Sequence, residues 1–509
     1  MTNEAQQAFV ANVTERRKGA HPTVPHIIAG VEYYDGPLIE RRDPSHPDVI
    51  VSACHDAPDE LVHKAVEASR KAQKEWARVP LAERIERVSR AIPYIEAHIE
   101  EWAVRVALEI AKPYAGSRAE GAEVLDIAKF STKYASAPGA FEDARETDPA
   151  GFANDSVLRP YGVFGMVTPF NYPIVQAAGP TIAALIAGNG MVVKTAADGP
   201  WSGHAVYEFC EVMNLPVGLV NIIHGADGPG RALVASDLDG ICFTGSVAVG
   251  RSIIRDYAAG PYSRPVIAEM GGKNPVIVTD DADLEEAAKG IVFSAFDMSG
   301  QKCSALSRVL VTQGAHDRLV ELVSERVKEL KNGDPIDPTV FAGPVVSPEA
   351  VDRYNKIVDV ANSAGFRVET GSTKGEGYLV PATVISGVPA AHDLATVEHF
   401  LPVLTISEVP DFETALSVAN DTDMGLTAGI YTGDLNEART FLAEVEAGCV
   451  DVNVPGHATT GWWPGPQTFG GWKGSGSTGK QALGKWYVGQ FARQQARKLP
   501  RELEHLLTY

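Results

Sequence analysis

Between residues 158 and 280, short apolar runs alternate with stretches that have the spacing of helices. The runs VFGMVTP, GMVVKTA, GLVNIIHG, GICFTGS and PVIAEMGG are predicted strands, with helices over SGHAVYEFCEVMN and GRALVASD between them. This alternation is typical of a parallel sheet with helices on both faces. Ligands bind at the carboxyl ends of such strands, so the pattern indicates a nucleotide-binding architecture.

A helical segment precedes this region, and a second α/β series follows it. From about Leu61 to Tyr134, apolar residues recur at three- and four-residue spacing with charges between them. The polar stretch 135–156 is predicted to be a linker or a projecting hairpin. Beyond it, the runs NPVIVTD, RVLVTQ, GYLVPATVI, LPVLTISEV and AGIYTG alternate with helices from about Asp283 and over HDRLVELVSERVKELKNG.

The length of 509 residues is too great for one hydrophobic core. We predict an α/β fold with a doubly wound dinucleotide-binding domain (1–135 and 157–269) and an α/β catalytic domain (270–467). Segments 136–156 and 468–509 are predicted to form an oligomerisation hairpin and tail. Exposed strands of such a hairpin seek a partner edge, so we expect a homodimer or a dimer-based oligomer.

Charge and cysteine usage exclude several classes of protein. The formal charge of −20 argues against nucleic acid or an anionic membrane as partner. The amino terminus lacks a secretory pattern, and the most apolar stretch, 177–193, is broken by Gly and Pro, so we predict a buried helix and strand there. The five cysteines form no CxxC or His/Cys cluster. We therefore expect a reducing cytoplasm, no disulfide framework and no metal.

Cys303 lies in the polar, glycine-bearing stretch SGQKCSAL (299–306). A free cysteine usually behaves as a small buried hydrophobe. Here the neighbours Gly300, Lys302 and Ser304 indicate a polar turn, which suits a thiolate nucleophile better than a core position. The other four cysteines have ordinary strand or helix contexts and are predicted to be core residues.

Two further side chains have the chemistry to assist a nucleophile. Glu269 ends the apolar run VIAEMGG, where desolvation raises the pKa of a carboxyl toward the range of a general base. The pair Gly271–Gly272 behind it would allow a ligand to approach the backbone closely. Asn171 in TPFNYP lies between two prolines that fix its direction, as suits a donor to an oxyanion.

Two stretches suggest a bound dinucleotide, although each is a weak signal alone. Lys194 stands at the end of the predicted strand in VVKTA. In FTGSVAVG, Gly245 and Ser246 form a turn before a helix, whose free N–H groups attract a pyrophosphate. The spacing differs from the GxGxxG fingerprint.

Taken together and in this order, these stretches resemble the aldehyde dehydrogenase superfamily over nearly the whole chain. Asn171 matches that family's Pro-Trp/Phe-Asn loop, Lys194 its ribose-binding lysine, and FTGS (243–246) the turn beneath the cofactor diphosphate. Glu269 in EMGGKNP matches the general base, and Cys303 in GQKCSA the nucleophile.

The resemblance implies NAD or NADP as cofactor and a task for each residue. The Cys303 thiolate would attack the aldehyde, and Asn171 with the Cys303 N–H would hold the oxyanion. After hydride transfer, Glu269 would activate water to hydrolyse the thioester. Glu398 would hold the nicotinamide ribose, with Phe400 beside the ring. The other cofactor residues implied are Thr168, Pro169, Lys194, Gly245 and Ser246.

Two departures concern the cofactor. Ala197 stands where strictly NAD-preferring members carry a glutamate, which removes a repulsion against a 2′-phosphate and leaves NADP open beside NAD. Leu401 stands where glycine is usual before Pro402, so a different placement of the ribose loop is open.

Within the superfamily, the chain is most similar to 1-pyrroline-5-carboxylate (glutamate-γ-semialdehyde) dehydrogenases. In those enzymes the residue matching Ser304, and small residues after the Thr460–Gly461 pair, receive the substrate's α-carboxylate. Here Trp462 and Trp463 follow instead. Two rings would either fill that pocket and favour an aromatic or apolar aldehyde, or pack outward. Phe170, Ser304, Gly461, Trp462 and Phe469 are the implied substrate residues.

Three other functions stay open at this point. A family member that transfers the acyl group to coenzyme A would generally lack the glutamate that Glu269 supplies. A cysteine hydrolase without redox chemistry would need a histidine base, for which His316 or His457 would have to fold close to Cys303. A catalytically silent binding protein would have no use for a nucleophile, a base and an oxyanion donor together.

Overall fold

The computed structural model describes residues 3–507 and contains two large sheets. The first sheet has seven strands in the order β12-β11-β8-β9-β10-β2-β3. The five strands from β12 to β10 are parallel, as predicted, and β2 and β3 extend the sheet in antiparallel fashion. In sheet order the strands are β12 (Val266–Glu269), β11 (Gly240–Thr244), β8 (Val163–Val167), β9 (Gly190–Lys194), β10 (Val220–Ile223), β2 (His26–Ile28) and β3 (Val31–Tyr33).

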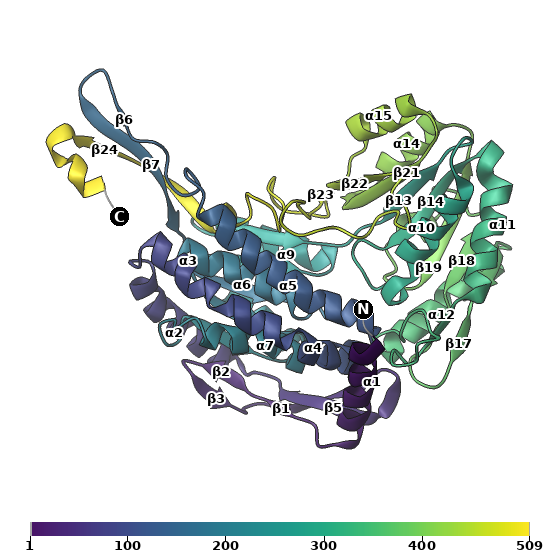
Figure 1. Ribbon diagram of the computed structural model, residues 1–509, viewed down its shortest axis with the longest axis horizontal. Helices are drawn as coiled ribbons and strands as arrows, with labels where there is room; N and C mark the ends of the chain where they lie inside the picture. Colours follow the sequence, from purple (N-terminus) through teal and green to yellow (C-terminus); the bar gives the residue numbers. More distant parts are fainter. Residues whose placement is uncertain (1–2, 508–509) are drawn as a thin grey trace.

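Helices cover both faces of this sheet (Figure 1). The predicted buried helix is α6, in which every residue except Gln176 is buried. It belongs to the largest core cluster, to which the fully buried Trp76 and Trp102 contribute from the amino-terminal helices. The helices are α2 (Asp59–Trp76), α3 (Leu81–Ser89), α4 (Ala91–Ile110), α5 (Tyr114–Ala135), α6 (Val175–Ala187), α7 (Pro200–Glu211), α8 (Asp227–Ala235) and α9 (Val247–Ala258).

The second sheet also has seven strands, in the order β16-β18-β19-β14-β13-β21-β22. All neighbours are parallel except β16, which is antiparallel to β18. The strands are β16 (Arg367–Thr370), β18 (Thr383–Ser386), β19 (Val403–Val409), β14 (Leu306–Thr312), β13 (Asn274–Val278), β21 (Thr427–Tyr431) and β22 (Cys449–Val452). The helices are α10 (Leu284–Phe296), α11 (Gln313–Glu329), α12 (Pro348–Ser363), α13 (Asp393–Thr396), α14 (Phe412–Asn420) and α15 (Leu435–Glu444).

The connection between the two sheets brings their edges together. The chain leaves the carboxyl end of β12 at Glu269 and enters the amino end of β13 at Asn274, only five residues later. The carboxyl ends of parallel strands lie at one edge of a sheet. The segments after β8, β9, β11 and β12 therefore meet at the same edge, opposite the loop that precedes β14.

A smaller sheet of order β24-β7-β6 projects from the body (Figure 1). It consists of β6 (Glu146–Thr147), β7 (Phe152–Pro160) and β24 (Ala492–Pro500). The register between β24 and β7 runs unbroken from Ala492 opposite Pro160 to Pro500 opposite Phe152. The stretch predicted to be a linker or hairpin is thus a hairpin, and the carboxyl-terminal strand extends it.

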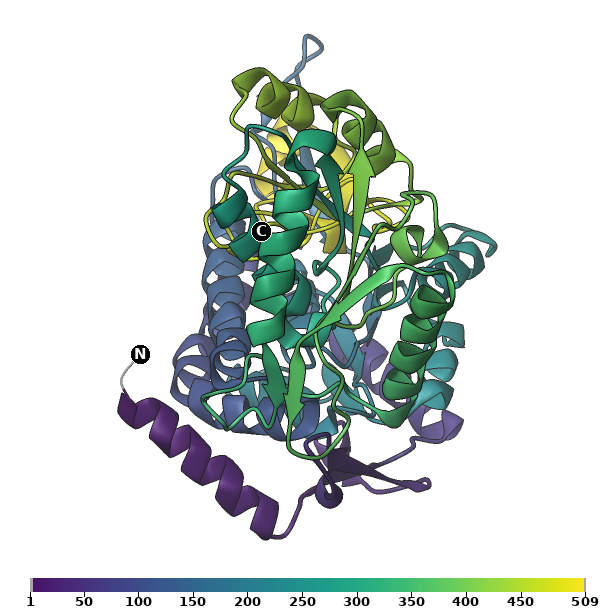
Figure 2. The same ribbon diagram turned by 90° about the vertical axis from the view of Figure 1, so that its right-hand side faces the viewer.

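The amino-terminal region contains elements that the sequence pattern did not indicate. Figure 2 shows α1 (Asn3–Lys18) along the outside of the body. Its Arg17 donates to Asp43 at 2.7 Å and to Asp334 at 2.6 Å, which ties the amino terminus to the region after α11.

The remaining elements are β1 (Thr23–Val24), β4 (Leu38–Asp43), β5 (His46–His55), β15 (Lys331–Gly333), β17 (Ser372–Lys374), β20 (Met424–Gly425), β23 (Trp472–Lys473), and the 3-10 helices η1 (Asp297–Gly300), η2 (Val488–Phe491) and η3 (Arg501–Leu507).

Among the described residues, none of the helices is both long and apolar enough to cross a membrane.

Candidate active site

The loop that carries Cys303 has an unusual backbone. After α10, the residues Met298, Ser299 and Gly300 have φ values of 54°, 54° and 68°. Left-handed conformations are costly for residues other than glycine, and such strain gathers at functional sites. At Gly300 a side chain would also be excluded by contact, because a Cβ there would lie 2.3 Å from the Leu401 carbonyl oxygen.

Hydrogen bonds from the second sheet and its surroundings hold this loop in place. The Asn274 side-chain amide donates to the Cys303 carbonyl at 2.7 Å and to the Ala305 carbonyl at 2.9 Å. The Gln301 side-chain oxygen accepts from the Val346 N–H at 2.9 Å. Fixed partners on both sides of the cysteine give the sulfur one defined position.

The Cys303 residue is partly accessible, but its sulfur is surrounded by protein atoms. Burial raises the pKa of the thiol to about 12, and the nearby Glu398 and Glu269 carboxylates act in the same direction. The prediction that this polar turn favours a thiolate is therefore wrong for this state, in which Cys303 is a neutral thiol. The other four cysteines are buried, as predicted.

Asn171 reaches the same loop from the end of β8. Its side-chain amide is 4% exposed and donates to the Gln301 carbonyl at 2.9 Å. This bond uses one of the two amide N–H groups, and within residues 3–507 the Cys303 backbone N–H has no acceptor. The Asn171 amide and the Cys303 N–H are thus two donors at one loop, and donors of this kind stabilise an oxyanion where they converge.

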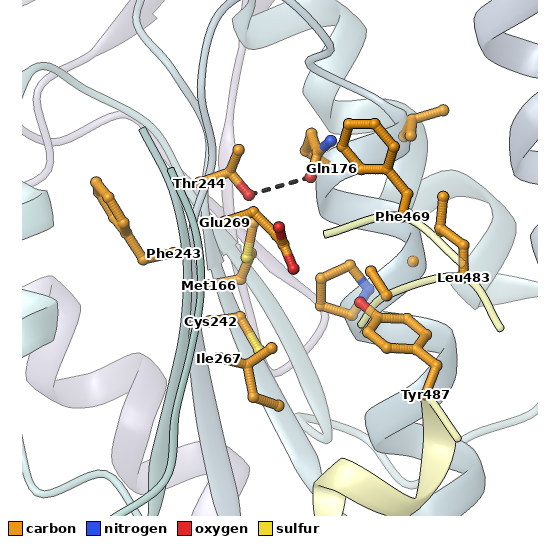
Figure 3. Close-up of a pocket in the computed structure, with 14 residues that line it drawn as sticks. Met166, Gln176, Cys242, Phe243, Thr244, Ile267, Glu269, Phe469, Leu483 and Tyr487 are labelled. Carbon is orange, nitrogen blue, oxygen red and sulfur yellow. Dashed lines mark hydrogen bonds between the residues drawn. The ribbon is translucent and has the colours of Figure 1, made fainter. Parts of the chain in front are cut away.

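Glu269 ends β12, and its carboxyl lies in a cavity of about 30 Å³ (Figure 3). Burial raises the pKa of Glu269 to about 8, although the Gly471 N–H acts in the opposite direction. The predicted desolvation is thus confirmed. Its Oε2 atom is buried and has no hydrogen-bond partner in the described part of the chain. A buried carboxyl of this pKa can take a proton from water near neutral pH.

The pair Gly271–Gly272 contacts a second carboxylate. Glu398 accepts from the Gly272 N–H at 3.0 Å, and a Cβ on Gly271 would lie 1.9 Å from the Glu398 Oε2 atom. The sequence predicted that a ligand approaches the backbone at this glycine pair, but here the Glu398 side chain lies against it. Phe400 follows at a φ of 57°, with its ring edge-to-face against Phe170 at 5.9 Å. Glu398, predicted to hold the ribose, is thus followed closely in the chain by Phe400, predicted to lie beside the nicotinamide. Phe400 contacts Phe170, a predicted substrate residue.

The carboxyl edge of the first sheet has the groups that a dinucleotide requires. Lys194 is 6% exposed, burial lowers its pKa to about 8, and its ammonium has no hydrogen-bond partner among the described residues. Thr168 follows β8, and its hydroxyl accepts from the Ala196 N–H at 3.1 Å. Gly245 and Ser246 precede α9, and the Ser246 hydroxyl caps that helix. A buried ammonium and a helix N-terminus at the same edge of the sheet are groups that a dinucleotide requires.

The two tryptophans of the predicted substrate loop occupy different places. Trp463 is 56% exposed, packs edge-to-face on Phe130 and donates to Asp126 on α5 at 3.3 Å. Trp462 is partly buried, and its indole N–H is buried without an acceptor in the described residues. The alternative in which both rings fill the carboxylate pocket is therefore wrong, because Trp463 lies on the outside of the protein.

The remaining substrate residues are divided between two places. Gly461 has a φ of 94°, and the backbone N–H groups of Gly461 and Trp462 have no acceptor among residues 3–507. The loop lies near Ser304, whose carbonyl accepts from the Thr459 hydroxyl at 2.8 Å. Phe469 lines the Glu269 cavity instead.

A buried charged cluster beside the nucleophile loop was not predicted. Lys112 pairs with Glu120 at 2.6 Å, and both side chains are almost fully buried. The Lys112 ammonium also lies 3.7 Å from the ring centre of Tyr172, and Lys302 contacts Asp297. The cluster reaches the nucleophile loop through Lys302, which directly precedes Cys303 in the chain.

Glu123, on the same face of α5 as Glu120, belongs to this cluster. Burial and the charge of Glu120 raise the pKa of Glu123 to about 7, against the effect of Lys112 and Lys302. It has no ion-pair partner within the part of the chain described. In the sequence, acids three residues apart on an amphipathic helix are typical of a solvated face, so no pattern marks this one as buried.

The fold has the strand-end edge that binds dinucleotides, and the site has a cysteine, a buried carboxyl and an amide donor near one loop. A sequence profile of the aldehyde dehydrogenase family matches residues 33–496. The chain is 31% identical over 486 residues to the 1-pyrroline-5-carboxylate dehydrogenase of Staphylococcus haemolyticus, covering 94% of this chain and 93% of that protein. It is 30% identical to the α-ketoglutaric semialdehyde dehydrogenase of Bacillus subtilis, covering 89% and 92%.

A solved structure of 1-pyrroline-5-carboxylate dehydrogenase from Thermus with bound NAD superposes with a TM-score of 0.89. It shares 29% identity, and the match covers 98% of this chain and 97% of that one. The chain therefore belongs to the aldehyde dehydrogenase family. It is an NAD-dependent enzyme that oxidises an aldehyde to a carboxylic acid.

Proposed function

We propose that Cys303, Asn171 and Glu269 carry out the reaction on one carbonyl carbon. The Cys303 sulfur bonds to the aldehyde carbon after losing its proton, and the Asn171 amide and the Cys303 N–H hold the oxyanion of the thiohemiacetal. NAD, when bound, supplies the hydride acceptor and leaves the acyl group on sulfur as a thioester. Lys194, the α9 N-terminus and Glu398 are the residues that would hold it, with Thr168, Pro169 and Phe400 beside them.

Hydrolysis of the thioester is the step that we assign to Glu269. Its deprotonated carboxylate takes a proton from the attacking water, the C–S bond breaks, and the carboxylic acid leaves. The raised pKa of this side chain supports the assignment over transfer to coenzyme A. A hydrolase without redox chemistry is less well supported, because His316 is on α11 and contacts Asp317 and Glu408.

As substrate we propose a small amino-acid semialdehyde, such as glutamate γ-semialdehyde. The acceptor-free N–H groups of Gly461 and Trp462, together with the Ser304 hydroxyl, suit a carboxylate. Glu123, half-buried and without an ion-pair partner in the described chain, suits an ammonium. An apolar or aromatic aldehyde would leave all these groups unpaired. Two of the relatives above, named 1-pyrroline-5-carboxylate dehydrogenase, support this substrate. The third is named for α-ketoglutaric semialdehyde, which shares the carboxylate but has no ammonium group.

We expect this substrate to show a kcat/KM higher by about 10²-fold or more than benzaldehyde or a straight-chain aldehyde of similar length. The physical reason is that analogues lacking the charged groups leave buried polar groups unpaired. Formation of reduced nicotinamide, followed with NAD and with NADP, measures both preferences. We propose NAD as the better cofactor, because Asp56, Asp198 and Asp227 near Lys194 would repel a 2′-phosphate.

Two tryptophan variants serve as a matched pair for this measurement. Trp463→Ala removes a ring on the outside and should leave the substrate ranking unchanged. Trp462→Ala changes the proposed carboxylate loop and should alter KM for the semialdehyde. If the unchanged enzyme instead prefers benzaldehyde and Trp462→Ala loses this preference, the substrate is an aromatic aldehyde.

We also propose a homodimer or a dimer-based oligomer, formed through the projecting sheet of residues 136–156 and the tail of residues 468–509. Among the described residues, β24 is the edge strand of that sheet, and β22 is an edge strand of the second large sheet. Exposed edges bind other strands readily. Light scattering at micromolar concentration should give a mass of two chains or a multiple, and a single-chain mass would exclude the proposal.

The division into domains 1–135 with 157–269 and 270–467 is likewise a proposal, in line with the two sheets. Five free, separate cysteines support a reducing cytoplasm as the compartment.

A further inference from the structure

The cavity that contains the Glu269 carboxyl is built from two sides (Figure 3). Strands β8, β11 and β12 form one side, and α6 with the segment 469–487 forms the other. Its volume of about 30 Å³ exceeds the space that one water molecule needs. Most of the lining is apolar: Met166, Val175, Pro180, Cys242, Ile267, Phe469 and Leu483.

Four polar side chains converge on this small space. Glu269 Oε2 is buried and has no hydrogen-bond partner in the described chain. The buried side chain of Tyr487 also lines the cavity. The Thr244 hydroxyl donates to the Gln176 side-chain oxygen at 3.0 Å, which leaves the Gln176 amide N–H groups free to donate. Figure 3 shows the Tyr487 hydroxyl pointing toward the Glu269 carboxylate.

Tyr487 is placed in this cavity by the residue opposite it. The side chain is 3% exposed, and its hydroxyl lies 3.6 Å from the point where a Cβ on Gly179 would stand. The Tyr487 hydroxyl thus packs within ordinary contact distance of α6 at Gly179.

Buried polar groups without partners are rare and are commonly satisfied by ordered water. We propose that this cavity is a water site of the catalytic base, and that Tyr487 is a positioning residue for it. Water bound there bridges the Tyr487 hydroxyl and the Glu269 carboxylate. The inference rests on the proposed role of Glu269 in hydrolysis.

The proton balance of the reaction gives this water a task. Glu269 holds one proton after each hydrolysis, when the C–S bond has broken and the acid has left. That proton must leave before the next turnover. The Glu269 O–H bond breaks, and the bridging water takes this proton and passes one on to solvent water, with no change of oxidation state. Glu269 is the only charged side chain in the lining. Tyr487 and Cys242 are the other titratable groups there, and Cys303 and Cys449 lie close by.

The variant Tyr487→Phe keeps the ring and removes the hydroxyl. We expect the first-turnover burst of reduced nicotinamide to be unchanged, because the hydroxyl acts after hydride transfer. The steady-state rate should fall about tenfold, as for the loss of one hydrogen bond to a charged group. The rising limb of its pH profile should move to higher pH, because a lost donor disfavours the ionised carboxylate.

Tyr257→Phe is the matched control. Its hydroxyl is buried without a partner in the described chain, and it lies on α9 outside the cavity. This control should leave the burst, the steady-state rate and the pH profile unchanged. Should Tyr487→Phe not fold, Gln176→Leu removes another donor from the cavity and should show the same slower steady state after a normal burst.

The outcomes separate this inference from the function on which it rests. Wild-type burst, rate and pH profile in both Tyr487→Phe and Gln176→Leu would overturn the water site while leaving the role of Glu269 intact. If the unchanged enzyme forms no reduced nicotinamide with any aldehyde, the proposed mechanism itself is refuted.

Discussion

Replacement of Cys303 by alanine is expected to reduce aldehyde oxidation by at least about 10⁴-fold, because no other group can form the covalent bond to the carbonyl carbon. The loop itself should survive the change. Its left-handed residues and the bonds from Asn274 and Gln301 do not involve the sulfur. The measurement is the initial rate of reduced nicotinamide formation with glutamate γ-semialdehyde and NAD.

The control for this variant is Cys449→Ala. Cys449 is a second buried thiol, close enough to affect the pKa of Cys303, but it lies on β22 and has no proposed part in the chemistry. Its removal should leave the rate within a few-fold of the unchanged enzyme. Turnover that survives in Cys303→Ala would leave only a binding or non-covalent function.

Replacement of Glu269 by glutamine should separate the two halves of the reaction. The nucleophile and the oxyanion donors remain, so one equivalent of reduced nicotinamide should still form in the first turnover. The steady-state rate should then fall by about 10²–10⁴-fold, the usual contribution of a general base. Rapid mixing followed by absorbance of the reduced nicotinamide measures both phases in one experiment.

The same carboxyl sets the expected pH dependence. Glu269 acts as a base only when it is ionised, and its pKa is about 8. Where hydrolysis limits the rate, kcat should therefore fall as pH drops below about 8, and Glu269→Gln should lose this dependence. Asp451→Asn is a matched control, since burial raises the pKa of that carboxyl to about 7 at a place outside the site. Loss of the burst in Glu269→Gln would contradict a role confined to hydrolysis.

The parts of the fold that were predictable are those whose signal is local. The apolar runs ending at Val167, Lys194, Thr244 and Glu269 are buried strands, and a parallel arrangement brings their ends to one edge. The start of α10 was visible at Asp283, whose side chain caps the helix. The meeting of Asn171 with the Cys303 loop follows from that arrangement.

The features that were missed depend on contacts between distant segments. Nothing near Glu120 or Glu123 in the sequence reveals that α5 turns this face toward Lys112 and Lys302. The left-handed run at Met298 and Ser299 has no composition signal, because both residues normally avoid that conformation.

The state of the nucleophile was beyond sequence reasoning for a related reason. A polar turn suggested a thiolate, but the two carboxylates that oppose ionisation, Glu398 and Glu269, come from other segments. Likewise, Gly271 and Gly272 correctly indicated that another group lies close to the backbone. That group is the Glu398 side chain, which is more than 120 residues away in the chain.

The most direct test is the intact mass of Glu269→Gln shortly after mixing with glutamate γ-semialdehyde and NAD, followed by mapping of the modified peptide. If acyl transfer to sulfur precedes release, the protein gains the mass of one acyl group per burst equivalent, and the gain maps to Cys303. A full burst of reduced nicotinamide with unmodified protein, or with the acyl group on another residue, would show that the chemistry does not pass through this thiol.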